Sequence, residues 1–402
     1  MAAAPLLVTV SGPDRPGVTS ALLDAAARGR LEVIDIEQVV LRGRLVLGFV
    51  LGGAREDAVV RGALHARAAE LGLQIEVRSG EAEPPHRPGR SHVTVLATRL
   101  TPAAVAGIAG RIADLGANID RIVRMARSPV TAVELEVSGV LPATLRAALA
   151  PQAASLGVDL AVQPAGLMRR AKRLVVMDVD STLIQGEVIE MIAERAGCAD
   201  QVAEVTAAAM RGELDFAEAL RQRVALLAGL DVAMLEQVRT GIKLAPGART
   251  LIRTLKRLDH RVGIVSGGFT QITDALAADL GLDYTAANTL EVRDGRLTGG
   301  LVGPLVDRAG KARALERFAA DAGVALSQTV AIGDGANDLD MLALAGLGVA
   351  FNAKPIVRQA ADTSVSHPYL DSVLFLLGIS REEIEAADAA DGGLATPAHE
   401  GV

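Results

Sequence analysis

From residue 172 onward, short apolar segments alternate with longer helical patterns, and this alternation limits the possible folds more than any other feature. The predicted strands are Leu174–Val179, Arg261–Val265, Thr329–Ile332 and Leu347–Phe351, and a fifth begins near Val365. Strands that are apolar throughout and separated by helices are typical of a parallel sheet with helices on both faces. We therefore predict an α/β domain over residues 168–385.

The stretch Val188–Thr240 interrupts this alternation, because it contains no apolar strand and has the pattern of several consecutive helices. It follows the first strand, and open α/β sheets bind their ligands at the carboxyl ends of the strands. We therefore predict a helical cap over a site, at about residues 186–245. Further along, Asp294-Gly295 lies between the alternating residues of Glu291–Leu297 and predicts a β-hairpin.

Two copies of one element order precede this domain. Residues 1–80 predict a strand, a helix, two strands joined at Arg42-Gly43-Arg44, a helix and a strand, and residues 92–167 repeat that order. The βαββαβ order is ferredoxin-like. Residues 81–91, rich in Pro and Gly, predict a linker between the copies. Near the C-terminus we expect one helix and then a flexible tail at residues 386–402.

Composition excludes several classes of protein. The 402 residues include 48 Asp and Glu against 41 Lys and Arg, whereas nucleic-acid and anionic-membrane binders are usually basic. The single cysteine, Cys198, excludes an internal disulfide framework and a cysteine-rich zinc site. No apolar run reaches the roughly 18–20 residues of a membrane helix, and Met1–Leu7 lacks the basic region of a signal peptide. We expect a cytoplasmic protein that binds neither nucleic acid nor membranes.

Two aspartates follow the first predicted strand, in the run Asp178-Val179-Asp180-Ser181-Thr182. Residues i and i+2 of an extended segment point to the same side, so both carboxylates would lie together at the strand end. Close carboxylates repel each other, and a divalent cation such as Mg²⁺ offsets that repulsion. The run therefore predicts a metal and catalytic site, although Asp and Ser here would equally suit a helix N-cap.

Polar residues also follow two other predicted strands, and a lysine lies between them. Ser266-Gly267-Gly268-Phe269 offers a hydroxyl and glycine amides that suit either a phosphate group or an ordinary turn into a helix. Gly333–Asp338 brings two carboxylates and Asn337 together after a glycine, which suits a hard cation. Lys311 is either a solvated helix residue or the cation that phosphate chemistry needs. Together these strand ends favour a phosphate site.

These motifs, in this order, resemble those of the haloacid dehalogenase superfamily of phosphohydrolases over about Arg173–Leu377. Within it, the chain is similar to the phosphoserine phosphatases, because Glu187 follows the first motif and the cap stretch Met210–Phe216 is followed by Arg223. The resemblance implies a Rossmann-like parallel-sheet phosphatase core with a helical cap insertion.

The resemblance also implies a role for each motif residue. Asp178 would be the nucleophile that forms an aspartyl-phosphate, and Asp180 the general acid and base. Asp178, the backbone carbonyl of Asp180 and Asp334 would hold Mg²⁺, with Asp338 acting on the metal or its waters. The remaining motif residues would bind and orient the phosphate: Thr182, Ser266, Gly267, Gly268, Lys311 and Asn337.

The cap residues would select the substrate. Glu187 suits the ammonium group of a free amino acid, and Arg223 suits its carboxylate. Met210, Gly212 and Phe216 would complete the pocket. Alternatively, Glu187 and Arg223 are solvated helix charges and Phe216 is a core residue.

The two N-terminal repeats resemble ACT domains, ferredoxin-like βαββαβ modules that bind amino acids between paired copies. The first repeat carries the glycine-marked loop Gly12–Gly17 before its first helix, and the second has Leu100–Gly107 at this place without the same string. A scaffold role without ligand is an equal alternative, and edge-strand pairing between such modules predicts a homodimer. The implied effector-binding residues are Gly17 and Gly107 for a carboxylate, and Asp35 and Asp120 for an ammonium group.

The sequence thus predicts a Mg²⁺-dependent enzyme that hydrolyses O-phospho-L-serine to L-serine and phosphate, with serine as the expected effector at the ACT domains. On this view residues 168–402 alone keep the activity and lose inhibition by serine. Three alternatives stay open: a phosphotransferase that passes the phosphoryl group to another alcohol such as homoserine, a phosphatase acting on phosphoproteins, and an amino-acid-binding regulatory protein with an inactive phosphatase half.

Overall fold

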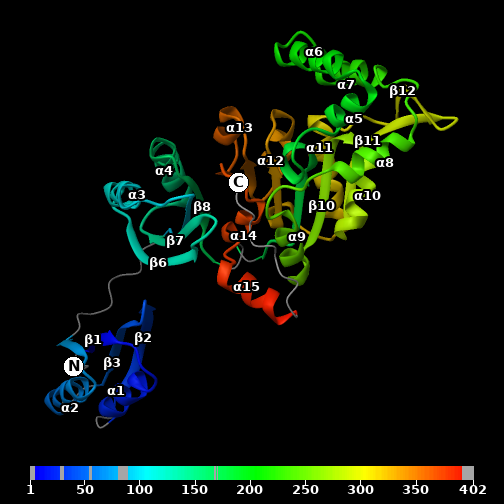
Figure 1. Ribbon diagram of the computed structural model, residues 1–402. Coiled ribbons are helices and arrows are strands. Elements are labelled where there is room, and N and C mark those ends of the chain that lie inside the picture. The colour runs from blue at the N-terminus through cyan, green and yellow to red at the C-terminus, as the bar shows by residue number, and fades with distance from the viewer. Residues whose placement is uncertain are drawn as a thin grey trace. The chain divides into compact units, whose positions relative to one another are not determined.

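The computed structural model describes residues 5–27, 31–53, 57–79, 89–166, 169 and 171–391. Most of the predicted linker and the end of the predicted tail, from residue 392, lie outside these ranges. The chain divides into two compact units, Met1–His86 and Arg87–Val402 (Figure 1). The second unit contains both the second ferredoxin-like repeat and the large α/β domain.

The first unit has the predicted ferredoxin-like order. Its elements are β1 (Leu6–Pro13), α1 (Val18–Ala26), β2 (Glu32–Leu41), β3 (Arg44–Gly52), α2 (Asp57–Glu70) and β4 (Gln74–Ser79). They form an antiparallel sheet in the order β2-β3-β1-β4. Alternate residues of β1, beginning with Leu6 and Val8, are buried in a core that includes Leu22 of α1 and Leu64 of α2.

The second repeat has the same order and the same sheet topology. Its elements are β5 (Ser91–Ala97), α3 (Pro102–Asp114), β6 (Asn118–Ala126), β7 (Thr131–Ser138), α4 (Pro142–Leu156) and β8 (Asp159–Pro164). The strands lie in the order β6-β7-β5-β8. The prediction of two ferredoxin-like repeats is therefore confirmed.

A seven-stranded sheet forms the centre of the large domain, in the order β12-β11-β10-β9-β13-β14-β15. Its strands are β9 (Leu174–Asp178), β10 (Arg261–Phe269), β11 (Tyr284–Arg293), β12 (Arg296–Val302), β13 (Thr329–Gly333), β14 (Gly348–Phe351) and β15 (Thr363–Val365). All neighbouring pairs are parallel except β11 with β12. The predicted parallel sheet is confirmed.

Two sequence predictions about these strands need correction. The predicted hairpin at Glu291–Leu297 exists, but its first strand begins at Tyr284 and extends the parallel sheet beside β10. Val365 ends β15 instead of beginning it. The pattern of apolar residues did not predict this start, because β15 begins with the polar residue Thr363. Thr363 Oγ1 donates a hydrogen bond to the Leu160 carbonyl of the second repeat, 3.1 Å away.

Helices cover both faces of this sheet. Alternate strand residues such as Val175 and Met177 share one core with α9 (Ala248–Arg257), α10 (Thr270–Leu280) and α14 (Val373–Leu376). The intervening residues Leu174 and Val176 share another core with side chains of α11 (Arg308–Asp321), α12 (Leu339–Leu344) and α13 (Pro355–Ala360). The last helix, α15 (Arg381–Ala390), continues past residue 386, where the tail was expected to begin.

The predicted cap consists of four helices: α5 (Val188–Ala196), α6 (Ala199–Met210), α7 (Phe216–Ala225) and α8 (Ala233–Gly241). They extend from the carboxyl edge of the sheet, next to the β11–β12 hairpin (Figure 1). The two linkers to the cap are paired with each other. Ile184 and Leu244 form a β-bridge, and the Gln185 amide donates to the Lys243 carbonyl at 2.8 Å. Among the described residues, none of the helices has the length and apolar character needed to cross a membrane.

Candidate active site

The first motif lies where β9 ends. Asp178 is the last residue of that strand, and Val179–Leu183 form a single tight turn in which Ser181 adopts a left-handed conformation (φ 57°). The Val179 amide donates to Asp178 Oδ1 at 2.8 Å. This turn separates the two carboxylates, so that Asp178 and Asp180 have different partners.

Asp178 faces a buried lysine. Lys311, on α11, is 1% exposed, and its Nζ lies 2.7 Å from Oδ1 of both Asp178 and Asp338. Burial opposes the charge of the ammonium group, but the two carboxylates outweigh this and raise the Lys311 pKa above its usual value. Burial, followed by the charge of Asp338, raises the pKa of Asp178, and Lys311 opposes that rise. The site therefore holds one cation among carboxylates that repel each other.

Three of the predicted metal ligands form an acidic cluster. One carboxylate oxygen from each of Asp178, Asp334 and Asp338 lies within 4.8 Å of the others. Burial and the neighbouring Asp338 raise the pKa of Asp334 to about 6. Such a set of oxygens fits Mg²⁺, because a hard divalent cation would offset this repulsion. The Asp180 side chain has other partners.

Glycines allow the third motif to fold tightly around Asp338. The Gly335 amide donates to Asp338 Oδ2 at 3.0 Å, and a Cβ at Gly333 would lie 2.4 Å from Asp338 Cγ. Thr182 Oγ1 donates to Asp334 Oδ1 at 3.1 Å, which connects the first motif to the third. The sequence Gly-Asp-Gly therefore brings two acidic side chains to one strand end without a steric clash.

Asp180 lines a pocket, and two hydrogen bonds hold its carboxylate. Its Oδ1 accepts a hydrogen bond from the Val188 amide at 2.7 Å, and its Oδ2 accepts one from Ser266 Oγ at 3.1 Å. Burial raises its pKa, so that it can hold a proton more readily than an exposed aspartate. Ser266 Oγ in turn accepts from the Gly268 amide at 2.7 Å.

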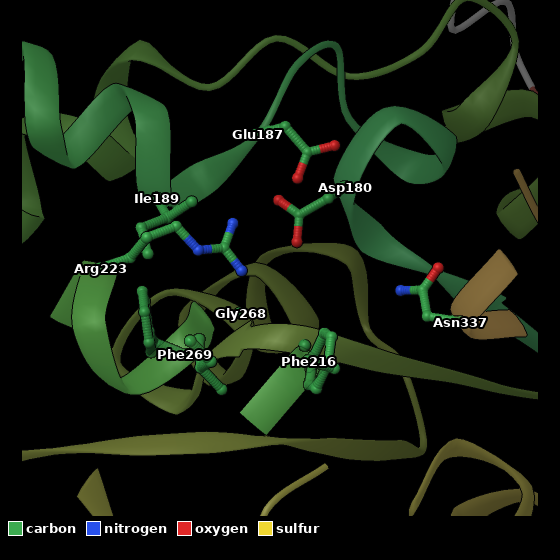
Figure 2. Close-up of a pocket in the computed structure, with 10 residues that line it drawn as sticks. Asp180, Glu187, Ile189, Phe216, Arg223, Gly268, Phe269 and Asn337 are labelled. Atoms are coloured by element: carbon green, nitrogen blue, oxygen red, sulfur yellow. The ribbon is translucent and has the colours of Figure 1, made fainter. Parts of the chain in front are cut away.

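The pocket beside Asp180 lies between residues of the sheet and residues of the cap. Figure 2 shows the Glu187 and Asp180 carboxylates close together, with the Arg223 guanidinium pointing toward them. Burial and then the Asp180 charge raise the pKa of Glu187 to about 7, while Ser181 Oγ donates to Glu187 Oε1 at 3.1 Å. The lining residues are Asp180, Glu187, Ile189, Phe216, Leu220, Arg223, Gly267, Gly268, Phe269 and Asn337.

Most of the predicted residues are brought together. Seven line the pocket. Others make hydrogen bonds or ion pairs beside it: Lys311 with Asp178 and Asp338, Thr182 with Asp334, and Ser266 with Asp180. Gly212 is different, since it lies in an exposed turn after α6, outside the set of lining residues. The Met210 side chain lies outside the described part of the structure.

Sequence reasoning missed Asn288 on β11. Its Nδ2 donates to the Gly267 carbonyl at 2.8 Å, and its Oδ1 accepts from the Val306 amide at 2.8 Å. Asn288 therefore joins the end of β10, at Gly267, to the segment that leads to Lys311. The extension of the sheet to β11 was not predicted, and without it an isolated asparagine gives no signal.

The predicted effector residues occupy different settings in the two repeats. Gly17 is the N-cap of α1 with φ 89°, and Asp35 is exposed on β2. Asp120 is exposed on β6, but Gly107 lies inside α3, where a Cβ would be 2.9 Å from Leu156 Cδ1 of α4. Gly107 therefore allows two helices to approach, and its place differs from that of Gly17.

Comparisons with known proteins agree with this architecture. Residues 175–343 match the haloacid dehalogenase-like hydrolases, and residues 4–78 and 90–163 each match an ACT domain. A phosphoserine phosphatase of Streptomyces coelicolor is 63% identical over 390 residues, covering 95% of this chain and 94% of the relative. The chain belongs to the phosphoserine phosphatase family.

Two further relatives support this membership. Phosphoserine phosphatase SerB2 of Mycobacterium tuberculosis is 52% identical over 396 residues, which cover 97% of each chain. The crystal structure of a probable phosphoserine phosphatase from Vibrio cholerae matches with a TM-score of 0.57 and 36% identity, covering 74% of this chain and 88% of that one. Family membership therefore extends over the ACT repeats as well as the hydrolase domain.

Proposed function

We propose that this protein hydrolyses O-phospho-L-serine to L-serine and phosphate. The observation that carries the proposal is the pairing of two sites: an Asp178–Lys311 centre and, next to it, a pocket with both Glu187 and Arg223. A free amino acid has one ammonium and one carboxylate group. Glu187 complements the first group, and the planar Arg223 fork complements the second.

The geometry supports a two-step reaction at phosphorus. An Asp178 oxygen attacks the phosphorus atom and displaces the seryl oxygen, to which Asp180 donates a proton. Asp180 then removes a proton from water, which attacks phosphorus and releases phosphate and free Asp178. Its raised pKa suits Asp180 to the first, protonated role, and the hydrogen bond with Ser266 orients it.

Charge on the transferring phosphoryl group needs positive partners. Lys311 is already fixed between Asp178 and Asp338, so it requires little reorganisation. The proposed ligands of Mg²⁺ are the carboxylates of Asp178, Asp334 and Asp338 and the backbone carbonyl of Asp180. The ion would offset the negative charge of these carboxylates and of the phosphate. Thr182, Gly267, Gly268 and Asn337 would position the phosphate, and Phe216 would exclude water beside it.

We also propose that serine regulates the enzyme through the ACT domains. Gly17, at the start of α1, would present backbone N–H groups to the serine carboxylate, and the exposed Asp35 would bind its ammonium group. In the second repeat Asp120 offers the same charge, but Gly107 lies inside α3 and not at the start of a helix as Gly17 does. The homodimer and the cytoplasmic location stay predictions from the sequence.

The test is phosphate release from O-phospho-L-serine in the presence of Mg²⁺. Asp178→Asn should abolish release, while Asp200→Asn, a matched change on the exposed surface of the cap, should leave it unchanged. Glu187→Gln should raise KM for phosphoserine about tenfold or more, as expected for loss of a charged hydrogen bond, with little effect on p-nitrophenyl phosphate. Good turnover of another phosphomonoester without turnover of phosphoserine would refute the proposal, and transfer to added homoserine would reveal a phosphotransferase.

A further inference from the structure

One segment of the large domain contacts both the second ACT domain and the cap linkers. We define it as the bridging segment, Thr363–Leu376. Asp159 of β8 accepts hydrogen bonds from Ser364 Oγ at 3.0 Å and from the Ser366 amide at 2.7 Å. Gln163 Nε2 of the same strand donates to the Leu376 carbonyl at 2.6 Å. The second ACT domain therefore holds the bridging segment at both of its ends.

The middle of the bridging segment holds the base of the cap. The Leu370 amide donates to the Pro246 carbonyl at 2.8 Å. Asp371, which is 1% exposed, lies directly over Gly247, where a Cβ would be 2.3 Å from Asp371 Oδ1. Gly247 has φ +79° and is the N-cap of α9, so the contact fixes the point at which the cap's second linker enters the core.

That linker is also bonded to the catalytic turn. The Ala245 amide donates to the Leu183 carbonyl at 2.9 Å, and the Gln185 amide donates to the Lys243 carbonyl at 2.8 Å. Leu183 is the last residue of the turn that contains Asp180. These bonds join the two linkers of the cap, so a displacement at Pro246–Gly247 would change the position of the cap over the pocket.

An ion pair with the partly buried Arg381 sets the position of Asp371. Arg381, the first residue of α15, donates from one guanidinium nitrogen to Asp371 Oδ2 at 2.8 Å, and its guanidinium lies 5.5 Å from the centre of the Phe375 ring. The same helix is held from two sides. Arg253 of α9 pairs with Asp388, and Arg124 of β6 in the second ACT domain pairs with Glu382 at 2.8 Å. In Figure 1, α15 lies at the base of the large domain, near α9 and α14.

We propose that Asp371 and Arg381 are positioning residues for the cap. They fix the second linker at Pro246–Gly247 so that the cap can close over an amino-acid substrate, and the second ACT domain sets the position of the bridging segment on which this depends. The kinetic part of this inference rests on the proposed phosphoserine phosphatase function. The structural part concerns the linker alone and can be tested without substrate.

The test compares Arg381→Ala with Arg381→Lys and with Asp371→Asn. In Arg381→Ala and Asp371→Asn, KM for phosphoserine should rise about tenfold, while kcat/KM for p-nitrophenyl phosphate, which offers the cap no amino-acid groups, should change by less than about twofold. Arg381→Lys keeps the charge and should recover most of the loss. The matched control is Arg257→Ala, which removes ion pairs of α15 with α9 but none with Asp371.

Hydrogen exchange supplies the second readout. The Ala245, Ala248, Leu251 and Leu370 amides, which all form backbone hydrogen bonds around the linker, should exchange faster in Arg381→Ala and not in Arg257→Ala. The inference would be overturned if Arg381→Ala lowered activity equally on both substrates or left amide exchange around the linker unchanged. It would also be overturned if Arg257→Ala gave the same results as Arg381→Ala. If wild-type protein turns over only p-nitrophenyl phosphate, the proposed function fails, and the exchange result still decides the positioning role.

Discussion

The two ACT repeats share the tripeptide Val-Thr-Val at the same place in the same sheet, yet its threonine has opposite surroundings. Thr9 in β1 is exposed, whereas Thr94 in β5 is fully buried. In both repeats the two valines face the repeat's own helices. The threonine points to the other face of the sheet, and in the second repeat this face meets the catalytic domain.

The last strand of each repeat shows the same difference. In β4 no residue is buried, while in β8 five of the six residues are. β8 lies against β15 through the hydrogen bonds of Asp159 and Thr363, and apolar residues such as Leu96 and Ala161 belong to the core of the catalytic domain. Equal folds therefore have unequal roles: the second repeat is part of the catalytic unit, and the first is a separate unit.

The largest expected effect comes from a charge at the two matched threonines. Thr94→Arg would bury an unpaired guanidinium against the catalytic domain, and we expect it to lower the free energy of unfolding by about 4 kcal/mol or more. Thr9→Arg adds the same side chain to an exposed face and should change it by less than about 0.5 kcal/mol. Urea unfolding of both variants measures this, and equal effects would contradict the distinction between the repeats.

Acid should weaken the second repeat's attachment through Glu134. Burial raises its pKa, but the His92 imidazole, whose Nδ1 lies 3.1 Å from Oε1, and the hydrogen-bonded Arg169 guanidinium outweigh burial and lower the pKa from 4.5 to about 2. A lowered folded-state pKa stabilises the fold above the unfolded value, and this stabilisation is lost as pH falls from 4.5 toward about 2. The contribution is on the order of 3 kcal/mol.

Glu134→Gln provides the check on that pH dependence. The difference in unfolding free energy between wild type and variant should shrink as pH falls through this window. Urea unfolding at a series of acidic pH values gives the difference directly. A gap that stays constant with pH would show that the Glu134 charge does not stabilise the attachment.

Inhibition by serine should depend on the first repeat more than on the second, with a roughly tenfold change in the inhibition constant. If serine binds at the start of α1, Asp35→Asn should raise its inhibition constant about tenfold. Asp120→Asn is the matched change in the second repeat and should have a smaller effect, because Gly107 is enclosed in α3. Inhibition by L-serine at a fixed phosphoserine concentration measures both variants. An equal loss in Asp120→Asn would place the effector site in the second repeat as well.

The smallest expected difference in stability concerns one arginine of each repeat. Arg146 of α4 bonds to Asp362 across the attachment and to the Val162 carbonyl of its own repeat, while Arg67 of α2 pairs with its helix neighbour Glu70 at 2.6 Å. Arg146→Ala should cost about 1 kcal/mol of stability and Arg67→Ala about 0.3 kcal/mol. Thermal unfolding of both variants resolves this difference, and a larger cost for Arg67→Ala would contradict it.

The contrast between the repeats also shows what a sequence can predict. Strand ends with Asp178, Ser266 and Asp334 were predictable, because parallel strands bring their carboxyl ends to one edge. The side chains that bond to those strand ends come from elements that are distant in the sequence, so local sequence patterns do not predict them. Asn288 is an example, since its role depends on β11 lying beside β10.

The attachment of the second repeat was not predictable for a related reason. β1 and β5 share the Val-Thr-Val pattern, and the core that the second repeat shares with the catalytic domain buries the outer face of β5. Gly107 was expected to correspond to Gly17, but Thr101 caps α3 with its own hydroxyl at 3.2 Å, so the helix begins without a glycine. Sequence similarity between repeats therefore predicted their fold and left their roles undetermined.

The most direct measurement compares three chains on O-phospho-L-serine: the full protein, residues 89–402 and residues 168–402. We expect residues 89–402 to keep kcat/KM within about twofold of the full protein and to lose inhibition by serine. Residues 168–402 should unfold at lower urea concentration, because removal of the second repeat breaks the hydrogen bonds between β8 and β15 and removes Leu96 and Ala161 from the shared core. If residues 168–402 prove as stable and active as residues 89–402, or if loss of the first repeat abolishes turnover, the second repeat is not the structural part of the catalytic unit that we describe.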